Sequence, residues 1–495
     1  MVSFYIQSNN NNYYHFNFNT KVLSLISPIT FRISTLMNEE KDEASILAIL
    51  STEYNLNSND AKFYLSQYSQ FEKATIQYSI AENYNMELTP QMIEATLSNL
   101  EQITFEVTDA CNLKCKYCGY GDFYENYDAR THKNLPIEHA KKLIEFLSKY
   151  WETKENLSEG EVIYVSFYGG EPLLNMPFIK SIVRLFDSYN LKRPIKYTMT
   201  TNAILLKKHI GYLASHDFHL LISLDGNKYN NSYRVWPNGK SSYNIVYECM
   251  KYIQDNLPAY FKDNIEFNAV LHDKNSVEEI INFFREEFSK TPLIGELNLN
   301  GIKKEKKDEF KTLFKDTAQS INESSQKGKL EKIMKDKDPF LNLLTVFIQR
   351  NSIMSYPDYN SLFSLKRKIQ SLPTGTCIPF SKKIFITVNG KLLPCERIGQ
   401  EYSLGYVTNQ KVELDLDVIC KYYNKWLMPI SQKCGTCYMR HSCQHCIFNF
   451  PNSEKPFCID YLDKENFKRF LKRAIDYLER NPQSYRHIMK DIIMR

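Results

Sequence analysis

Three cysteines that lie close together in the sequence have the spacing of iron–sulfur ligands. They fall in the segment 108–118, with three residues between Cys111 and Cys115 and two between Cys115 and Cys118. Three thiolates bind three irons of a [4Fe–4S] cube, whereas full ligation takes four cysteines, so one iron stays open to a small molecule. Zinc is the alternative, but three ligands without a nearby histidine complete its coordination poorly. The spacing therefore predicts a cluster with one open iron.

Further motifs stand where predicted strands end. Gly169–Pro172 follows the second strand, and Glu171 can accept hydrogen bonds from an ammonium group. Thr200–Asn202 and Ser223–Gly226 end the third and fourth strands, and Arg234 comes eleven residues after Ser223. Ordinary turn chemistry would explain each motif alone. Chance does not readily explain why these motifs occur in order on successive strands.

In these segments the chain resembles the radical S-adenosylmethionine (SAM) superfamily, whose hallmark is this cysteine spacing with an aromatic residue before the last cysteine. In that family the open iron binds the amino and carboxylate groups of SAM, and an electron from the cluster breaks the S–C5′ bond to give a 5′-deoxyadenosyl radical. The resemblance implies that the cluster is bound by Cys111, Cys115 and Cys118. It implies that SAM is bound by Tyr117, Gly169, Gly170, Glu171, Pro172, Thr200, Asn202, Ser223, Asp225 and Arg234.

A second cysteine field lies toward the end of the chain. Of the twelve cysteines, eight fall between Cys377 and Cys458. Clustered thiols in a reducing compartment bind metal more often than they form disulfides. Residues 434–446 have the pattern C-x2-C-x5-C-x2-C, and Cys395 ends a predicted hairpin over 384–395 with an Asn-Gly turn. A four-cysteine zinc site is the alternative for the dense run.

This field resembles the SPASM extension of radical SAM enzymes that modify peptides and proteins, which binds two auxiliary [4Fe–4S] clusters. The resemblance implies one cluster on Cys434, Cys437, Cys443 and Cys458, and another on Cys377, Cys395 and Cys446. The last spacing of the dense run is two residues where the family has three, and a cysteine shortly after the first is missing. The cluster at Cys377 therefore either keeps an open iron or is completed by Cys420. With the SAM-binding cluster, three clusters are expected.

Alternating strand and helix patterns must position these motifs. The candidate strands are Ile103–Thr108, Val162–Tyr168, Ile195–Thr200, His219–Leu224, Ile265–Leu271 and Ile294–Leu299. Segments with helical spacing of apolar residues, such as Pro136–Trp151, separate them. Barrels of such units carry their chemistry at the C-terminal ends of the strands. The pattern predicts an α/β fold with a partial (β/α)6 TIM-type barrel.

The segment before the barrel predicts a winged-helix-like unit. Tyr13–Phe18 and Lys21–Ile26 are expected to pair as strands, and helical patterns follow over 30–37, 43–54 and 59–71. This order looks like the element by which maturases of ribosomally made peptides bind a precursor's leader as an added strand. A dimerisation or packing module is the alternative. The expected domains are a leader-peptide recognition-like domain over 1–75, a linker over 76–100, the radical SAM barrel over 101–302, a helical bridge over 303–372, a loop-rich, cysteine-dense SPASM domain over 373–460 and a C-terminal helix over 461–495.

Composition bears on partners and location. Lys and Arg total 62 against 57 Asp and Glu, and residues 30–71 contain only Arg32, Lys41 and Lys62 as basic groups. Nucleic acid is therefore not an expected partner. The sequence shows no signal-peptide pattern and no long apolar stretch, which predicts a cytoplasmic protein without a membrane segment. The expected partners are a precursor peptide with a leader and an electron donor such as flavodoxin or ferredoxin.

The resemblance implies an enzyme that installs a crosslink, such as a thioether or a cyclophane-type bond, in a precursor peptide. Glu396 follows Cys395 where related sulfatase maturases place an acidic residue, usually Asp, so it is the candidate base that takes a proton from the substrate. Its alternative is an ion pair with a neighbour such as Arg397. Two other functions stay open, an anaerobic sulfatase-maturase-like enzyme that generates formylglycine and a non-catalytic peptide-binding scaffold. The intact cysteine loop argues against the scaffold.

Overall fold

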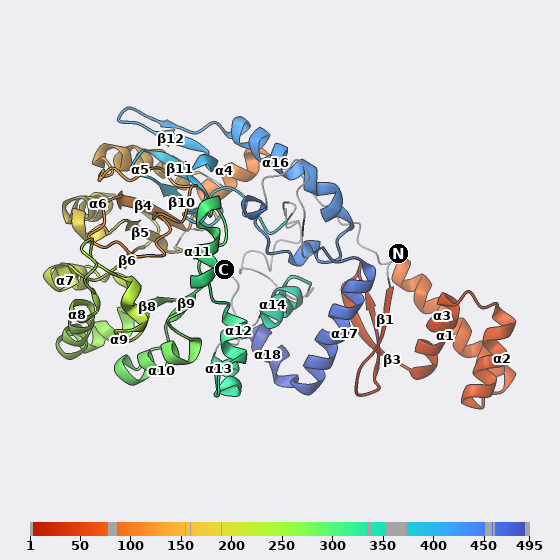
Figure 1. Ribbon diagram of the computed structural model, residues 1–495. Helices are drawn as coiled ribbons and strands as arrows, with labels where there is room; N and C mark the ends of the chain where they lie inside the picture. Colours follow the sequence, from red (N-terminus) through yellow and green to blue (C-terminus); the bar gives the residue numbers. More distant parts are fainter. Residues whose placement is uncertain are drawn as a thin grey trace.

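A ten-stranded mixed sheet lies toward one end of the computed structural model, and a small N-terminal unit lies at the opposite end of the molecule (Figure 1). The structure describes residues 3–77, 87–153, 155–158, 160–189, 191–333, 339–351, 372, 374–450, 458 and 461–490. The order of the central strands is β13-β12-β11-β10-β4-β5-β6-β7-β8-β9.

Six parallel strands carry the predicted β/α units. They are β4 (Gln102–Thr108), β5 (Ile163–Gly169), β6 (Ile195–Thr201), β7 (His219–Ser223), β8 (Ile265–Val270) and β9 (Leu293–Gly295). The helices that cover them are α5 (Ile137–Trp151), α6 (Met176–Ser188), α7 (Leu206–Ser215), α8 (Tyr243–Asn256), α9 (Pro258–Asn264) and α10 (Val277–Phe288). The predicted partial barrel is confirmed. Its last strand ends earlier than predicted, and the residues after it turn toward Tyr124, whose hydroxyl donates to the carbonyl of Asn298 at 3.0 Å.

Side-chain alternation explains how the barrel divides into a core and a lumen. Along β4, Ile103, Phe105 and Val107 point to one side and are fully buried with the helices. The residues between them face the interior of the barrel, as strand geometry requires. The apolar stripe of α5 completes the core by the usual three- and four-residue spacing of buried side chains.

The predicted hairpin extends this sheet. Its strands are β10 (Lys383–Ile386) and β11 (Lys391–Leu393), and β12 (Gly405–Val407) and β13 (Val412–Glu413) continue the antiparallel order. Gly390 adopts the left-handed φ of 78° that the Asn-Gly turn requires. The sequence did not predict that β10 would pair parallel with β4, with Ile384 opposite Ile103. This pairing covers an edge of the barrel that would otherwise expose backbone donors and acceptors.

The N-terminal unit contains one strand more than predicted. β1 (Ser3–Gln7) joins β2 (Tyr13–Asn17) and β3 (Val22–Ile26) in an antiparallel sheet, and α1 (Pro28–Asn38), α2 (Glu43–Tyr54) and α3 (Ser58–Gln77) follow. The three helices form a core of their own around Ile33, Ile46 and Leu50. The segment 76–100, expected as a linker, contains α4 (Pro90–Ser98), which buries Ile93 and Leu97 against the barrel core. Residues 78–86 of that segment lie outside the described residues.

The N-terminal sheet shares a core with the last helices of the chain, although its sequence suggested a unit of its own. Phe4 and Phe16 contact Phe467 of α17 (Lys464–Arg480) at ring-centroid distances of 5.1 and 6.0 Å. Polar contacts add to this seam, because Tyr14 donates to Glu479 at 2.8 Å. The N-terminal sheet and α17 therefore lie side by side (Figure 1).

Further helices join these parts. They are α11 (Lys307–Leu313), α12 (Thr317–Asn322), α13 (Lys327–Ile333), α14 (Pro339–Asn351), α16 (Leu416–Thr436) and α18 (Pro482–Lys490). Short 3-10 turns occur at η1 (Pro172–Asn175), η2 (Asn230–Tyr233), η3 (Lys304–Lys306), η5 (Gln400–Tyr402), η6 (Arg440–Ser442) and η7 (Ile447–Asn449). Parts of the expected bridge, SPASM and C-terminal segments lie outside the described residues, namely 334–338, 352–371, 373, 451–457, 459–460 and 491–495. Within the described ranges, no helix combines the length and apolarity needed to cross a bilayer.

Candidate functional site

The cysteine loop, residues 108–118, leaves the C-terminal end of β4 and is held on one side by the Gly169–Pro172 motif. The backbone N–H of Gly170 donates to the carbonyl of Thr108 at 2.8 Å, and that of Glu171 donates to the carbonyl of Ala110 at 2.9 Å. A Cβ atom on Gly170 would lie 2.0 Å from the Ala110 carbonyl oxygen, so no side chain fits there. The glycine is therefore needed for the close approach of two loops.

The segment that contains Arg234 holds the other side of the cysteine loop. Lys114 N–H donates to the carbonyl of Val235 at 2.7 Å, and Lys116 N–H donates to that of Tyr233 at 3.1 Å. The loop is thus fixed through its main chain from two directions. The thiols take no part in the hydrogen bonds that anchor the loop to these two segments.

Glu171 is fully buried and accepts three hydrogen bonds. Its donors are the Thr201 hydroxyl at 2.7 Å, the Asn202 N–H at 2.8 Å and the Leu173 N–H at 3.1 Å. Burial raises the pKa of Glu171 to about 7, although these bonds favour the charged form. A carboxylate has about four acceptor positions, so one is left for a further donor such as an ammonium group.

A buried ion pair lies behind the cysteine loop. Arg234 donates through two nitrogens to Asp225, at 2.9 and 3.1 Å, and Tyr117 donates its hydroxyl to the same carboxylate. Burial alone would raise the pKa of Asp225, but the charge of Arg234 and the hydrogen bonds from His272, Arg234 and Tyr117 together outweigh it and hold the pKa at about 2. Arg234 was expected to reach SAM, and the structure shows two of its nitrogens engaged with Asp225 instead. The SAM-binding role of these residues stays a prediction.

Sequence reasoning missed two residues at this site. His272 is fully buried and lies 3.8 Å from Asp225, stacked on the Tyr117 ring. Its position just after β8 is the same strand-end signal that identified the other motifs. Glu106 lies in β4, and its carboxylate accepts from the Val388 N–H of the hairpin turn at 2.9 Å. Burial raises the pKa of Glu106 to about 7. In the sequence, an acidic residue within an otherwise apolar strand was the feature that could have identified Glu106.

Within the cysteine loop, burial and neighbouring thiols raise the pKa of Cys111 and Cys115. Burial, Cys118 and Cys111 raise the pKa of Cys115 to about 12, while Arg234 lowers it. The N–H of Leu113 donates to the sulfur of Cys111 at 3.4 Å, and the Asn202 amide lies 3.8 Å from the same sulfur. Three thiolates so close together need a cation to offset their repulsion, and N–H donors to sulfur are typical of iron–sulfur sites. These residues fit the cluster that the spacing predicts.

The thiols of the second field form two groups. Burial and the neighbouring thiols Cys443, Cys437 and Cys458 raise the pKa of Cys434 to about 12. Burial also raises the pKa of Cys446 to about 11, and there the neighbouring thiols are Cys395 and Cys377. The structure therefore brings together the same two sets that the resemblance implied. Their role as cluster ligands stays a prediction.

Cys420 belongs to neither group by these interactions. It is buried in α16, and burial together with the charge of Asp417 raises its pKa to about 11. The structure describes all twelve cysteines and places none of them in a disulfide. No three His, Cys, Asp or Glu side chains among the described residues converge on a single metal ion. The groups are therefore sets of neighbouring thiols rather than formed single-ion sites.

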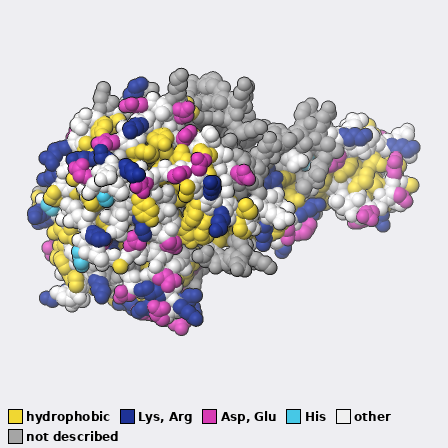
Figure 2. All heavy atoms as spheres, turned by 90° about the horizontal axis from the view of Figure 1, so that it is seen from above, with side chains coloured by type: hydrophobic (Ala, Val, Ile, Leu, Met, Phe, Trp, Pro, Cys, Tyr) yellow, Lys and Arg dark blue, Asp and Glu magenta, His cyan; other side chains and the backbone are white. Residues whose placement is uncertain are grey.

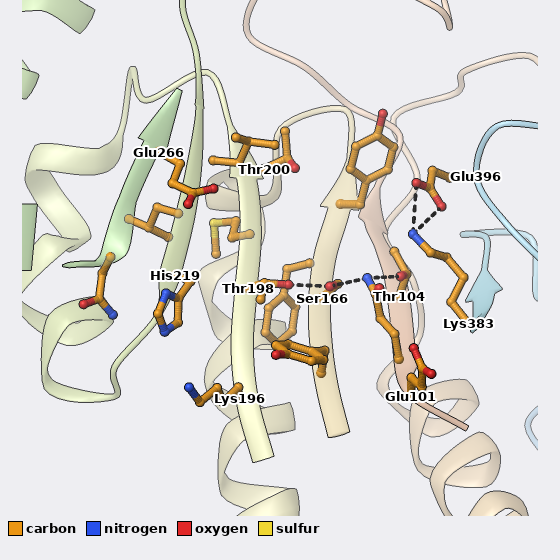
Figure 3. Close-up of a pocket in the computed structure, with 18 residues that line it drawn as sticks. Glu101, Thr104, Ser166, Lys196, Thr198, Thr200, His219, Glu266, Lys383 and Glu396 are labelled. Carbon is orange, nitrogen blue, oxygen red and sulfur yellow. Dashed lines mark hydrogen bonds and ion pairs between the residues drawn. The ribbon is translucent and has the colours of Figure 1, made fainter. Parts of the chain in front are cut away.

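The barrel lumen is a cavity of about 630 Å³ that extends along the strands (Figure 3). Gln102 donates to Ser166 at 2.6 Å and to Thr104 at 3.1 Å, which makes a polar rung across its middle. Thr200 and Glu396 lie near the C-terminal ends of the strands, whereas Glu101 and Lys196 lie at the other end.

Glu396 makes an ion pair at the upper end of this cavity. Its partner is Lys383 of β10, with 3.1 Å between the nitrogen and one carboxylate oxygen. The sequence suggested a neighbour such as Arg397 as the pairing partner, and the structure shows Lys383 in that position. Two further predicted SAM-binding residues, Pro172 and Ser223, lie at the start of η1 and the end of β7.

Comparisons with known proteins find similarity to radical SAM proteins. The sequence model of the Radical SAM superfamily matches residues 105–286. A cysteine-type anaerobic sulfatase-maturating enzyme of Clostridium novyi is 23% identical over 407 residues, which cover 77% of this chain and 97% of that protein. The radical SAM cyclopropyl synthase TigE of Paramaledivibacter caminithermalis is 26% identical over 182 residues, 36% of each chain.

A solved structure is similar in outline. It is native anSMEcpe with bound AdoMet and Cp18Cys peptide, with a TM-score of 0.46 and 17% sequence identity. The alignment covers 79% of this chain and 99% of that one.

Proposed function

We propose that this enzyme, whose residues 105–286 form a radical SAM domain homologous to those of sulfatase-maturating enzymes and TigE, modifies a ribosomally made precursor peptide. One observation carries the proposal. Thr200, a predicted SAM contact, and Glu396, beside a predicted auxiliary-cluster ligand, line the same cavity. A substrate residue in that cavity would lie between the two reactive regions.

The radical SAM family implies a [4Fe–4S] cluster and SAM, which when bound supply a 5′-deoxyadenosyl radical that abstracts hydrogen from the substrate. Cys111, Cys115 and Cys118 would hold that cluster. Glu171 would use its remaining acceptor position to orient the ammonium group of SAM. The two backbone contacts around the cysteine loop would keep its thiols in place during the reaction.

Glu396 is the residue that we assign to proton removal. A substrate that has lost hydrogen must also lose an electron and usually a proton before a crosslink or carbonyl is complete. Glu396 stands at the cavity, and Lys383 holds its carboxylate there through their 3.1 Å contact. Cys377, Cys395 and Cys446 beside it would hold one auxiliary cluster, and Cys434, Cys437, Cys443 and Cys458 would hold the other.

The N-terminal unit supports a peptide substrate with a leader. In the described residues β3 pairs with β2, and its other edge is the outer edge of the sheet. The side chains of Val22, Leu23 and Leu25 on this strand are 44%, 45% and 69% exposed. Figure 2 shows that hydrophobic side chains also gather on the surface at this end of the molecule. A leader that adds a strand to β3 would gain main-chain hydrogen bonds and cover these side chains.

A second candidate is a sulfatase-maturase-like activity, which forms formylglycine in a protein substrate. The Clostridium novyi match favours it, because that match covers 97% of the relative's length. Both candidates use the same barrel and cavity. They differ in whether the peptide is recognised through the N-terminal sheet.

A direct assay separates the two candidates. Anaerobically reconstituted enzyme is incubated with SAM, a reductant and either the short peptide encoded beside its gene or a sulfatase peptide containing the target cysteine. We expect mass spectrometry to show loss of hydrogen from the first peptide only. Conversion of the sulfatase peptide alone would reject the proposal in favour of the second candidate.

The leader site is tested by point variants. Deletion of residues 1–75 would expose the apolar face of α17, so Leu25→Asp is the cleaner change. It should weaken precursor binding severely while SAM cleavage without peptide persists. Val418→Asp is the control, because Val418 is 58% exposed on α16, outside this unit, and its substitution should leave binding unchanged. Equal precursor affinity of Leu25→Asp and wild type would contradict leader binding at β3.

A further inference from the structure

The hydroxyl of Tyr423 is a buried polar group without a hydrogen-bond partner among the described residues. Tyr423 lies on the buried face of α16 and is only 1% exposed. Leaving a hydroxyl unpaired in the interior costs free energy, because the hydrogen bond that it made to water is not replaced. A phenylalanine would avoid this cost, so the hydroxyl needs an explanation.

Tyr423 packs against the segments that carry the thiols of one predicted auxiliary cluster. Its ring contacts Phe448 edge to face at 5.5 Å, and Phe448 lies two residues after Cys446. Phe448 also packs in one hydrophobic cluster with Cys395. The Tyr423 hydroxyl is therefore buried among these segments, where it can donate a hydrogen bond.

Other polar groups beside these thiols already have partners. Arg397 donates its N–H to the sulfur of Cys395 at 3.2 Å, and the hydroxyl of Thr376 accepts from the Ile447 N–H at 2.8 Å. Sulfur is thus already the acceptor of one N–H donor here. Tyr423 is a buried donor beside the same thiols that lacks such a partner among the described residues.

We propose that the Tyr423 hydroxyl donates a hydrogen bond to a sulfur of the auxiliary cluster on Cys377, Cys395 and Cys446. The inference rests on the proposed assignment of a cluster to these three thiols. It makes Tyr423 a positioning residue, which acts on the substrate only through the cluster. Hydrogen bonds to sulfur stabilise the more negative, reduced state of a cluster and so raise its reduction potential.

The test is the isosteric variant Tyr423→Phe in the full-length protein. Both proteins also carry Cys111→Ala, Cys115→Ala and Cys118→Ala, so that the spectra report the auxiliary clusters alone. Potentiometric titration followed by electron paramagnetic resonance gives the midpoint potential of each cluster. We expect Tyr423→Phe to keep its iron content and to shift one auxiliary midpoint to a lower potential. The half-buried neighbour Tyr422→Phe is the matched control and should shift neither.

Each other outcome overturns a distinct step. Identical midpoints in Tyr423→Phe and its parent would refute the hydrogen bond. Loss of one cluster's iron from Tyr423→Phe would show a ligand instead of a donor and would also refute it. A parent protein with iron for only one auxiliary cluster would overturn the cluster assignment in the proposed function, before the variant is considered.

Discussion

The cysteine loop and the second cysteine field position their thiols by different means. The loop places three thiols within eight residues, and backbone hydrogen bonds from two neighbouring segments fix it at the end of β4. The second field gathers its thiols from residues 377–458, through a hairpin, a long helix and several turns. One site therefore depends on local geometry, and the other depends on packing between distant segments.

The two regions also differ in their charge. A buried ion pair, Asp225 and Arg234, backs the cysteine loop, which suits a site for a charged, polar ligand such as SAM. Aromatic side chains surround the second field, including Tyr402, Trp426 and Phe448. A low-polarity surrounding makes each hydrogen bond to a cluster weigh more in its potential. Under the proposed function, this difference would suit the first region to bind SAM and the second to set the reduction potential of a cluster.

The strongest prediction separates the regions by iron content. The triple variant Cys111→Ala, Cys115→Ala and Cys118→Ala should abolish SAM cleavage and remove about four of about twelve irons, as expected for one of three [4Fe–4S] clusters. The measurement is iron analysis of anaerobically reconstituted protein, with deoxyadenosine detected by chromatography. Loss of all iron would show that the two regions are not independent.

The next prediction concerns the chemistry between the regions. Glu396→Gln keeps the shape of the side chain but removes the base, so formation of modified peptide should fall about a hundredfold, as for other general bases. Deoxyadenosine formation should continue. Glu101→Gln, at the opposite end of the same cavity, should have a much smaller effect. Wild-type rates of both products in Glu396→Gln would contradict the base role.

Breaking the ion pair should destabilise the binding region. Asp225→Asn leaves the Arg234 charge buried without its partner, which typically costs about 3–5 kcal/mol. The free energy of unfolding in urea measures this loss. The exposed pair of Lys141 and Glu138 provides the control, because Glu138→Gln should change stability by at most about 1 kcal/mol. Similar losses in both variants would contradict the buried pair's special role.

A packing variant tests whether the N-terminal sheet belongs to the core beside the second field. Phe467→Ala removes a fully buried ring that contacts Phe4, Phe16 and Tyr438, and should cost about 3 kcal/mol. Phe63→Ala is the matched control, since that side chain is 57% exposed. The measurement is the unfolding temperature by calorimetry. An unchanged unfolding temperature in Phe467→Ala would contradict this shared core.

The smallest expected effect is a pH dependence of the N-terminal sheet. His15 is 1% exposed, and burial lowers its pKa to about 4. The folded state therefore keeps the ring neutral, while the unfolded state takes up a proton below about pH 6.5. Stability should be constant above that pH and fall as the pH drops toward 4, by about 2 kcal/mol at pH 5. His15→Gln should lose this slope, and an unchanged slope would assign it to other groups.

The sequence by itself determined the cysteine loop, the strand-end motifs and the hairpin before Cys395. These features depend on residues near one another in the chain, because periodicity, turn chemistry and ligand spacing are local. The same reasoning found β4 to β8 and the N-terminal helices. It missed β1, a strand of only five residues whose buried side chains, Phe4 and Ile6, are covered once β2 pairs with it.

Only the tertiary structure decided how the distant segments meet. The parallel pairing of β10 with β4 brings Glu396 to the barrel lumen, and nothing in either strand alone specifies that partner. The seam between the N-terminal sheet and α17 joins residues more than 400 positions apart. Tyr423 gains its role in the same way, since a tyrosine in a helix is ordinary until folding buries its hydroxyl beside three thiols. Burial and long-range pairing are properties of the folded chain, and a local pattern does not contain them.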